Sequence, residues 1–208
     1  PKFEAQNMKH LAFCELGFRH FTNNVKEVTK ASDMSGLSIR VQEAPVWFAL
    51  ADSLGFIATP IAFNELYTAL QQKTVDGQEN PIAHIETYNL FEVQDYLVMT
   101  EHALILSWSI FNADFWNGLA ETDRAYLTEK FVKEAQMSIE SVNKATEETF
   151  DKLESEYNMT VITPESGLDK QAFIDNADKF LKENFTAPEY DSWWEYRNAA
   201  VEWCEANG

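Results

Sequence analysis

Short apolar runs, most of them bounded by Gly, Pro, Asn or Asp, recur through the first hundred residues and predict strands and helices in alternation. Runs typical of short strands lie at residues 8–13, 36–41, 57–60 and 96–100. Segments with helical spacing of apolar residues lie at 46–54, 63–72 and 81–88. Pro45 and Gly55 suit the start and the end of the first of these helices. This alternation predicts an α/β layer with a mainly parallel sheet.

A different pattern begins near Glu121. Residues 121–157 are rich in Glu, Lys and Ala and contain neither Gly nor Pro, which predicts one uninterrupted helix. At 1.5 Å per residue such a helix would be roughly 50 Å long, more than one small lobe needs. It therefore suits a connection between two lobes. Residues 161–162 are a candidate short strand, and residues 170–205 are helical with a break near Pro188.

Composition narrows the possible partners. The chain is 45% hydrophobic and 24% charged, as in an ordinary globular protein, but its formal net charge is -18. Such a charge disfavours binding to nucleic acid or to an anionic membrane surface. The longest apolar run, residues 103–111, is far shorter than the ~20 residues that span a bilayer, so no membrane insertion is expected. The first residues lack the pattern of a secretory signal peptide, so we expect a cytoplasmic chain or a mature form.

Arg40 is the candidate for chemistry, because it lies within a predicted strand. A charge buried in a strand costs several kcal/mol unless it is paired or binds a ligand. The chain has only four arginines against 34 acidic residues. A guanidinium fits a carboxylate through two parallel hydrogen bonds, so Arg40 is expected to hold the carboxylate of a small organic acid. The alternative is a structural ion pair with a neighbouring acidic residue.

Five blocks along the chain resemble, in sequence order, the solute receptors of tripartite ATP-independent periplasmic (TRAP) transporters of the dicarboxylate-receptor, or DctP-like, type. The blocks are FRHFTNN at 18–24, MSGLSIRV at 34–41, PIAFNELYTALQ at 60–71, VDGQENP at 75–81 and FEVQDYL at 91–97. Residues 112–119 and the long predicted helix also fit this family, whereas the C-terminal part matches only loosely.

The resemblance implies an α/β, periplasmic-binding-protein-like fold of two lobes with a lobe-spanning helix. The first lobe would be incomplete, because the family has a further segment before the first strand. Residues 1–17 would be a remnant of the first lobe and 18–103 the second lobe with the carboxylate site. Residues 104–157 would return to the first lobe through the long helix, and 158–208 would pack on the second lobe. The implied function is a periplasmic receptor that delivers an organic-acid anion to a TRAP membrane permease, without a cofactor.

The same resemblance implies roles for individual residues. Arg40 would make the bidentate contact with the ligand carboxylate, with Arg19 in support. Asn80 would reach the same carboxylate, although an Asn before Pro81 also suits a helix cap. Phe63 would pack on the body of the ligand, although it is equally a candidate for the core.

Further residues carry weaker indications. Glu43 and Trp47 follow Arg40 closely and could face the cleft, where a carboxylate would bind hydroxyls and an indole would cover a ring. The four histidines have no metal-ligand spacing, and His84 and His102 are interpreted as ordinary surface or helix residues. Cys14 and Cys204 are interpreted as two unrelated thiols, with a long-range disulfide as the alternative.

Two other readings of the function stay open. One is a non-transport α/β protein, either a small-molecule sensor or an enzyme domain. The sequence has no nucleotide-binding loop and no nucleophile motif to support catalysis. The other is a truncated chain that exposes apolar surface and associates with itself.

Overall fold

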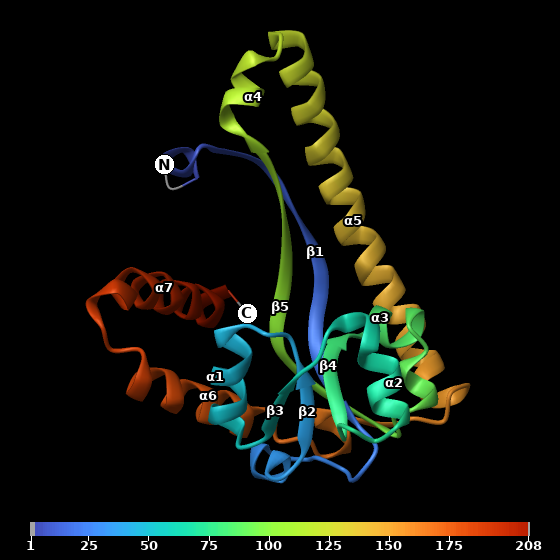
Figure 1. The fold of residues 1–208 in the computed structure, drawn as a ribbon. Helices are drawn as coiled ribbons and strands as arrows, with labels where there is room; N and C mark the ends of the chain where they lie inside the picture. Colours follow the sequence, from blue (N-terminus) through green and yellow to red (C-terminus); the bar gives the residue numbers. More distant parts are fainter. Residues whose placement is uncertain (1–2, 208) are drawn as a thin grey trace.

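The computed structural model describes residues 3–207 and places its strands in one mixed sheet (Figure 1). The order across the sheet is β3-β2-β4-β1-β5-β6. The strand bounds are β1 Met8–Asn23, β2 Ser38–Val41, β3 Ile57–Pro60, β4 Gly77–Pro81, β5 Tyr96–Asn112 and β6 Thr160–Ile162. β2 runs parallel to β3 and β4, and β5 runs parallel to β6. The prediction of a mainly parallel sheet is wrong at the centre, because β1 is antiparallel to both of its neighbours.

β1 and β5 are far longer than the strands predicted at residues 8–13 and 96–100. Their inner ends belong to the sheet, and their outer ends continue together as an antiparallel ribbon (Figure 1). Gly17, which follows the strand predicted at residues 8–13, has a φ of 91° and lies at a shift in register between β1 and β5. A second bulge contains Glu101, with a φ of 50°, between the pairs Phe21–Val98 and Arg19–Ala103. Cross-strand pairing thus carries both strands through positions that would interrupt an isolated one.

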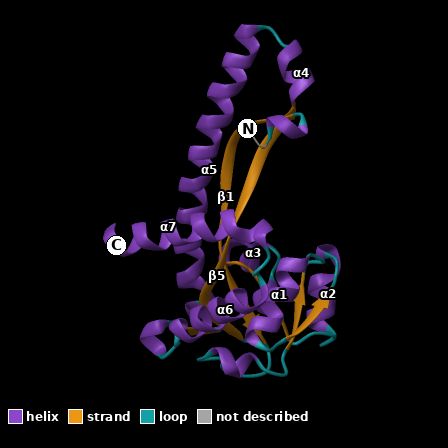
Figure 2. Ribbon diagram, turned by 90° about the vertical axis from the view of Figure 1, so that its left-hand side faces the viewer, coloured by secondary structure: helices purple, strands orange, loops and turns teal. Residues whose placement is uncertain are grey.

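The long predicted helix is confirmed as α5, Glu121–Ser155. It follows α4, Ala113–Gly118, whose first turn is capped by the side chain of Asn112. Figure 2 shows α5 running beside the ribbon back to the sheet. At its inner end Glu86 accepts hydrogen bonds from Thr149 at 2.6 Å and from Lys152 at 2.8 Å. These contacts hold the helix against α3, Ile82–Thr87.

Besides α3, α4 and α5, the described residues form four helices. They are α1 Pro45–Leu54, α2 Leu66–Gln71, α6 Lys170–Asn184 and α7 Asp191–Asn207. Of these, α1, α2 and α6 pack against the sheet. Short 3-10 helices complete the described elements: η1 Glu4–Gln6, η2 Ala31–Met34, η3 Phe63–Glu65, η4 Leu90–Glu92, η5 Pro164–Ser166 and η6 Pro188–Tyr190. The predicted helices at 46–54 and 170–205, with their caps and break, are confirmed.

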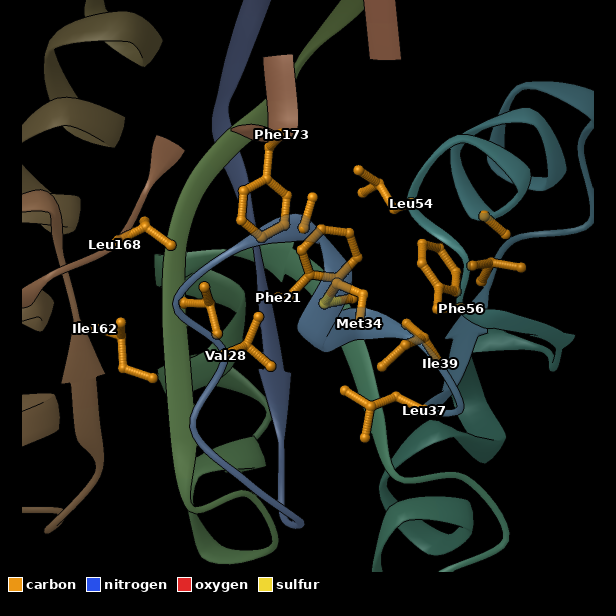
Figure 3. Packing of buried hydrophobic residues seen from close by; sticks show 14 of the residues in the cluster. Phe21, Val28, Met34, Leu37, Ile39, Leu54, Phe56, Ile162, Leu168 and Phe173 are labelled. Carbon is orange, nitrogen blue, oxygen red and sulfur yellow. The ribbon is translucent and has the colours of Figure 1, made fainter. Parts of the chain in front are cut away.

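Two apolar clusters lie on opposite faces of the sheet. Val98 belongs to one cluster and Leu97 to the other, as expected for neighbours in a strand. The first cluster joins Phe21 and Ile39 of the sheet to α1 and to Phe173 of α6 (Figure 3). The second lies beneath α2, α3 and the end of α5. Helix α1 contributes its buried residues at i, i+4 and i+7, which is the spacing of one helical face.

β4 is the strand that the sequence did not predict. Gly77 pairs with Asn23 on one side and with Ile39 on the other. A Cβ atom at Gly77 would lie 2.0 Å from the carbonyl oxygen of Thr22. Only glycine therefore allows the two backbones to approach this closely.

Gly77→Ala is expected to destabilise the protein by about 3 kcal/mol, because the added methyl group must push β4 away from β1. Urea unfolding monitored by circular dichroism would measure the loss. Gly118→Ala is the matched control, since a Cβ there meets nothing within 4 Å. That variant should be neutral or slightly stabilising. Equal effects of the two substitutions would contradict this account of Gly77.

Candidate functional site

The candidate site lies where β2 and β4 end side by side. Arg40 and Asn80 occupy the carboxyl-terminal parts of these parallel strands. Arg19 of the antiparallel strand β1 pairs with Pro81, so it reaches the same edge of the sheet. Ligands in α/β proteins commonly bind outside the carboxyl ends of parallel strands. The fold thus brings together Arg40, Asn80 and Arg19, three of the four polar candidates from the sequence.

Arg40 is buried, with 2% of its surface exposed. Its Nε donates to the carbonyl oxygen of Ile61 at 2.8 Å, which fixes the plane of the guanidinium. Its Nη1 is buried and has no hydrogen-bond partner among the described residues. Burial lowers the pKa of Arg40, with Glu79 acting in the opposite direction and Arg19 in the same one. Among residues 3–207 no carboxylate forms a salt bridge with Arg40, unlike the structural ion pair considered above.

Arg19 is similarly buried, but its Nε and Nη2 both have hydrogen-bond partners. Its Nη2 donates to Glu79 Oε1 and to Asn80 Oδ1, both at 2.9 Å, and its Nε donates to Glu79 Oε2. The guanidinium carbon lies 5.1 Å from the ring centre of Trp47. Glu79, with 0% exposure, neutralises Arg19 and leaves Arg40 as the uncompensated cation. Sequence reasoning missed Glu79, although it is the residue before Asn80.

A chain of side-chain hydrogen bonds holds Asn80 in place. Its Nδ2 donates to Gln78, and Gln78 Nε2 donates to Thr22 Oγ1 at 2.9 Å. Thr22 in turn donates to Gln94 Oε1 at 2.6 Å. Asn80 lies within β4, and the cap position of α3 is Pro81, so the interpretation of Asn80 as a helix cap is wrong. These four hydrogen-bonded residues lie in three of the sequence blocks quoted above. The pattern of neighbouring residues within each block does not indicate that they contact one another.

Two histidines border the site. His102 lies in β5 with its side chain 5% exposed, so the interpretation of it as a surface or helix residue is wrong. Its Nε2 is 3.4 Å from Glu79 Oε2, its Nδ1 is 2.8 Å from Thr100 Oγ1, and burial lowers its pKa. His20 is 2% exposed, and burial, followed by the charges of His102 and Lys170, lowers its pKa to about 3.

The other predicted residues have different settings. Phe63 is 38% exposed and lies 5.6 Å from the Arg40 guanidinium carbon. Trp47 is 6% exposed and belongs to the core beneath Arg19, so little of its indole faces outward. Glu43 is exposed, between β2 and α1. Cys14 carries a free thiol, whereas the side chain of Cys204 lies outside the described residues.

Within residues 3–207 no cluster of His, Cys, Asp and Glu has the arrangement of a metal site. Over the same residues, no helix combines the length and the apolar character needed to cross a bilayer.

Residues 1–187 match the family described as bacterial extracellular solute-binding protein, family 7 (DctP). The chain therefore belongs to this family, whose members bind solutes rather than transform them. The 2,3-diketo-L-gulonate-binding periplasmic protein YiaO of Escherichia coli is 30% identical over 182 residues, which are 88% of this chain and 54% of that protein.

Solved structures agree with this assignment. A TRAP periplasmic solute binding protein from Bordetella, with density assigned to pantoate, has a TM-score of 0.78 and 33% identity over 88% of this chain and 60% of its own. A TRAP periplasmic solute binding protein from Roseobacter denitrificans, with bound L-galactonate, has a TM-score of 0.78 and 28% identity. The match covers 91% of this chain and 61% of that protein. These structures confirm the predicted α/β fold of the periplasmic binding-protein kind. The chain spans less than two thirds of the length of each of these proteins.

Glu79→Gln is expected to destabilise the protein by about 3–5 kcal/mol, because it leaves Arg19 buried without its counter-charge. Urea unfolding at neutral pH would measure the effect. Glu148→Gln, which removes the exposed partner of Lys144, should change the unfolding free energy little. Similar small effects of both substitutions would show that the buried pair is not needed for folding.

Stability is expected to fall in mild acid because of His20. Its pKa is about 3 in the folded chain, against about 6.5 in the unfolded chain, so between these values only the unfolded chain binds the proton. The free energy of unfolding should therefore decrease as pH falls, by about 1.4 kcal/mol per pH unit. Urea unfolding from pH 7 to pH 5 should show a shallower decrease in His20→Gln. Identical slopes in both proteins would contradict this origin.

Proposed function

We propose that this protein is an extracytoplasmic receptor that binds a small organic-acid anion through Arg40 and delivers it to a TRAP membrane permease. The observation that carries the proposal is the buried guanidinium of Arg40, whose Nη1 has no partner among the described residues. Desolvation of a charge at such a position costs several kcal/mol, and an arriving carboxylate would offset that cost. Family membership supports the receptor role, the permease partner and a periplasmic location.

The surroundings of Arg40 favour one carboxylate. Arg19 already has its counter-charge in Glu79, so an incoming anion would meet a single uncompensated guanidinium. The net charge of the chain is -18, so attraction of an anion has to be local rather than long-range. Arg19 would act by orienting Asn80, which would reach the same carboxylate. A bidentate contact between a planar guanidinium and a carboxylate would fix the orientation of the acid as well as its charge.

The remaining predicted residues would act on the body of the ligand. Phe63 would pack on it, because its exposed ring lies beside the guanidinium. Glu43 would bind hydroxyl groups from the connection between β2 and α1. Trp47 would contribute through its contact with Arg19, since its ring is largely buried. Three of the compared proteins are named for, or hold, 2,3-diketo-L-gulonate, L-galactonate and pantoate, all of which carry a carboxylate.

Arg40→Ala is expected to weaken binding of the acid by about 2–5 kcal/mol, as for loss of one partner of a buried charge pair. Native mass spectrometry of the gently purified protein would identify a co-purifying acid, and isothermal titration calorimetry with a panel of organic acids would give the affinities. Arg124→Ala, in the first turn of α5, is the matched control and should bind normally. Unchanged affinity in Arg40→Ala would refute the assignment of Arg40.

A further inference from the structure

The structure describes three buried side-chain nitrogens that have no hydrogen-bond partner among residues 3–207. They are Arg40 Nη1, His84 Nδ1 and His10 Nε2. The first two lie around the same ring, because the Arg40 guanidinium carbon is 5.6 Å and the His84 ring 6.4 Å from the ring centre of Phe63. A buried polar group without a partner is costly and calls for an explanation. Two such groups around one exposed ring point to one bound molecule.

His84 comes from α3, which the sequence predicted but to which it assigned no function. Tyr88, four residues later, lies on the same face and donates its backbone N–H to the carbonyl oxygen of His84 at 3.1 Å. The rings of Tyr88 and Phe63 meet edge to face at 4.7 Å, and those of Tyr88 and His84 lie 5.7 Å apart. Phe63 and Tyr88 are 38% and 45% exposed. The three rings form an aromatic patch that opens beside Arg40.

The charge of His84 decides what it can bind. Burial, and then the positive charge of Arg19, lower its pKa. At neutral pH its ring is therefore uncharged, with one nitrogen that donates a hydrogen bond and one that accepts. A neutral imidazole is a poor competitor with Arg40 for a carboxylate. It matches a hydroxyl group, which both donates and accepts.

We propose that His84 determines specificity in the acid site by binding a hydroxyl group of the ligand through Nδ1 while Arg40 holds its carboxylate. The inference rests on the proposed function and narrows it to hydroxylated acids. The carbon chain of such an acid would lie along Phe63 and Tyr88, whose faces suit C–H groups. The hydroxyl would satisfy Nδ1, which an unsubstituted aliphatic acid of the same length would leave without a partner.

D-Gluconate and hexanoate are the probes for this inference. Both are six-carbon acids, but gluconate has a hydroxyl on every carbon beyond the carboxylate, so one is available at any distance from Arg40. Calorimetry on the wild-type chain should show that gluconate binds more tightly. In His84→Phe, which keeps a ring but removes both nitrogens, gluconate affinity should fall about tenfold, as for loss of one buried hydrogen bond. Hexanoate affinity should not fall.

Two further variants keep the test decisive. His84→Asn, which retains a side-chain amide able to donate and accept, should preserve most of the affinity for gluconate even if the phenylalanine variant folds poorly. His10→Phe removes the third unpartnered nitrogen, in the outer ribbon where His10 stacks on Phe3, and should leave the affinity for gluconate unchanged.

The possible failures are distinguishable. If Arg40→Ala weakens binding of both acids but His84→Phe leaves the preference for gluconate intact, the role of His84 is refuted and the receptor function stands. If His84→Phe lowers the affinity for both acids equally, His84 acts only through packing and its proposed role is refuted. Hexanoate binding without gluconate binding, or no gluconate binding to the wild-type chain, also overturns the inference. Gluconate binding that Arg40→Ala leaves unchanged overturns the proposed contact with Arg40 as well.

Discussion

The ion pair between Arg19 and Glu79 is the interaction on which the candidate site depends. Both side chains are almost completely buried, so the charge of each would be costly there without the other. The pair links neighbouring strands β1 and β4, and Arg19 also holds the amide of Asn80. Within the pair, Glu79 compensates the charge of Arg19, which is one of two buried positive charges that lie close together. The remaining charge, on Arg40, then has a defined place and no internal counter-ion among the described residues.

The antiparallel course of β1 makes this pair possible. A parallel strand between β4 and β5 would present a different set of side chains at the edge where β2 and β4 end. Instead β1 places Arg19 opposite Pro81, one register step from the pair of His20 with Asn80. The close approach of β1 at Gly77 belongs to the same pairing. β1 then continues beyond Gly17 into the ribbon that packs against α5, so the strand that positions the site also supports the longest helix.

Local patterns predicted the helices and short strands well, because amphipathic spacing, Pro45, Gly55 and the uniform helix formers of α5 are properties of neighbouring residues. Local patterns did not predict β4, because its residues Gln78, Glu79 and Asn80 are polar and lack the apolar alternation of a strand. These residues are buried because Thr22 and Arg19 supply their hydrogen bonds, and Thr22 is held in turn by Gln94. Those partners come from distant parts of the chain. The same reason explains His102. Arg40 could be predicted as a site residue because a lone arginine in an apolar strand is unusual in its local sequence. Arg19, Asn80 and Phe63 could be predicted only from the resemblance of the chain to a known family.

The charges around Arg40 explain why neutral groups complete the site. Arg19 and Glu79 cancel, and burial lowers the pKa of His20, His84 and His102, so none of these three rings adds a positive charge at neutral pH. The buried cluster therefore carries one net positive charge, which equals the charge of one carboxylate with opposite sign. A second buried cation would attract an anion more strongly but would also repel Arg40 in the empty site. Discrimination among acids of equal charge then falls to groups that bind without charge, and the aromatic patch with its neutral imidazole is placed to supply them.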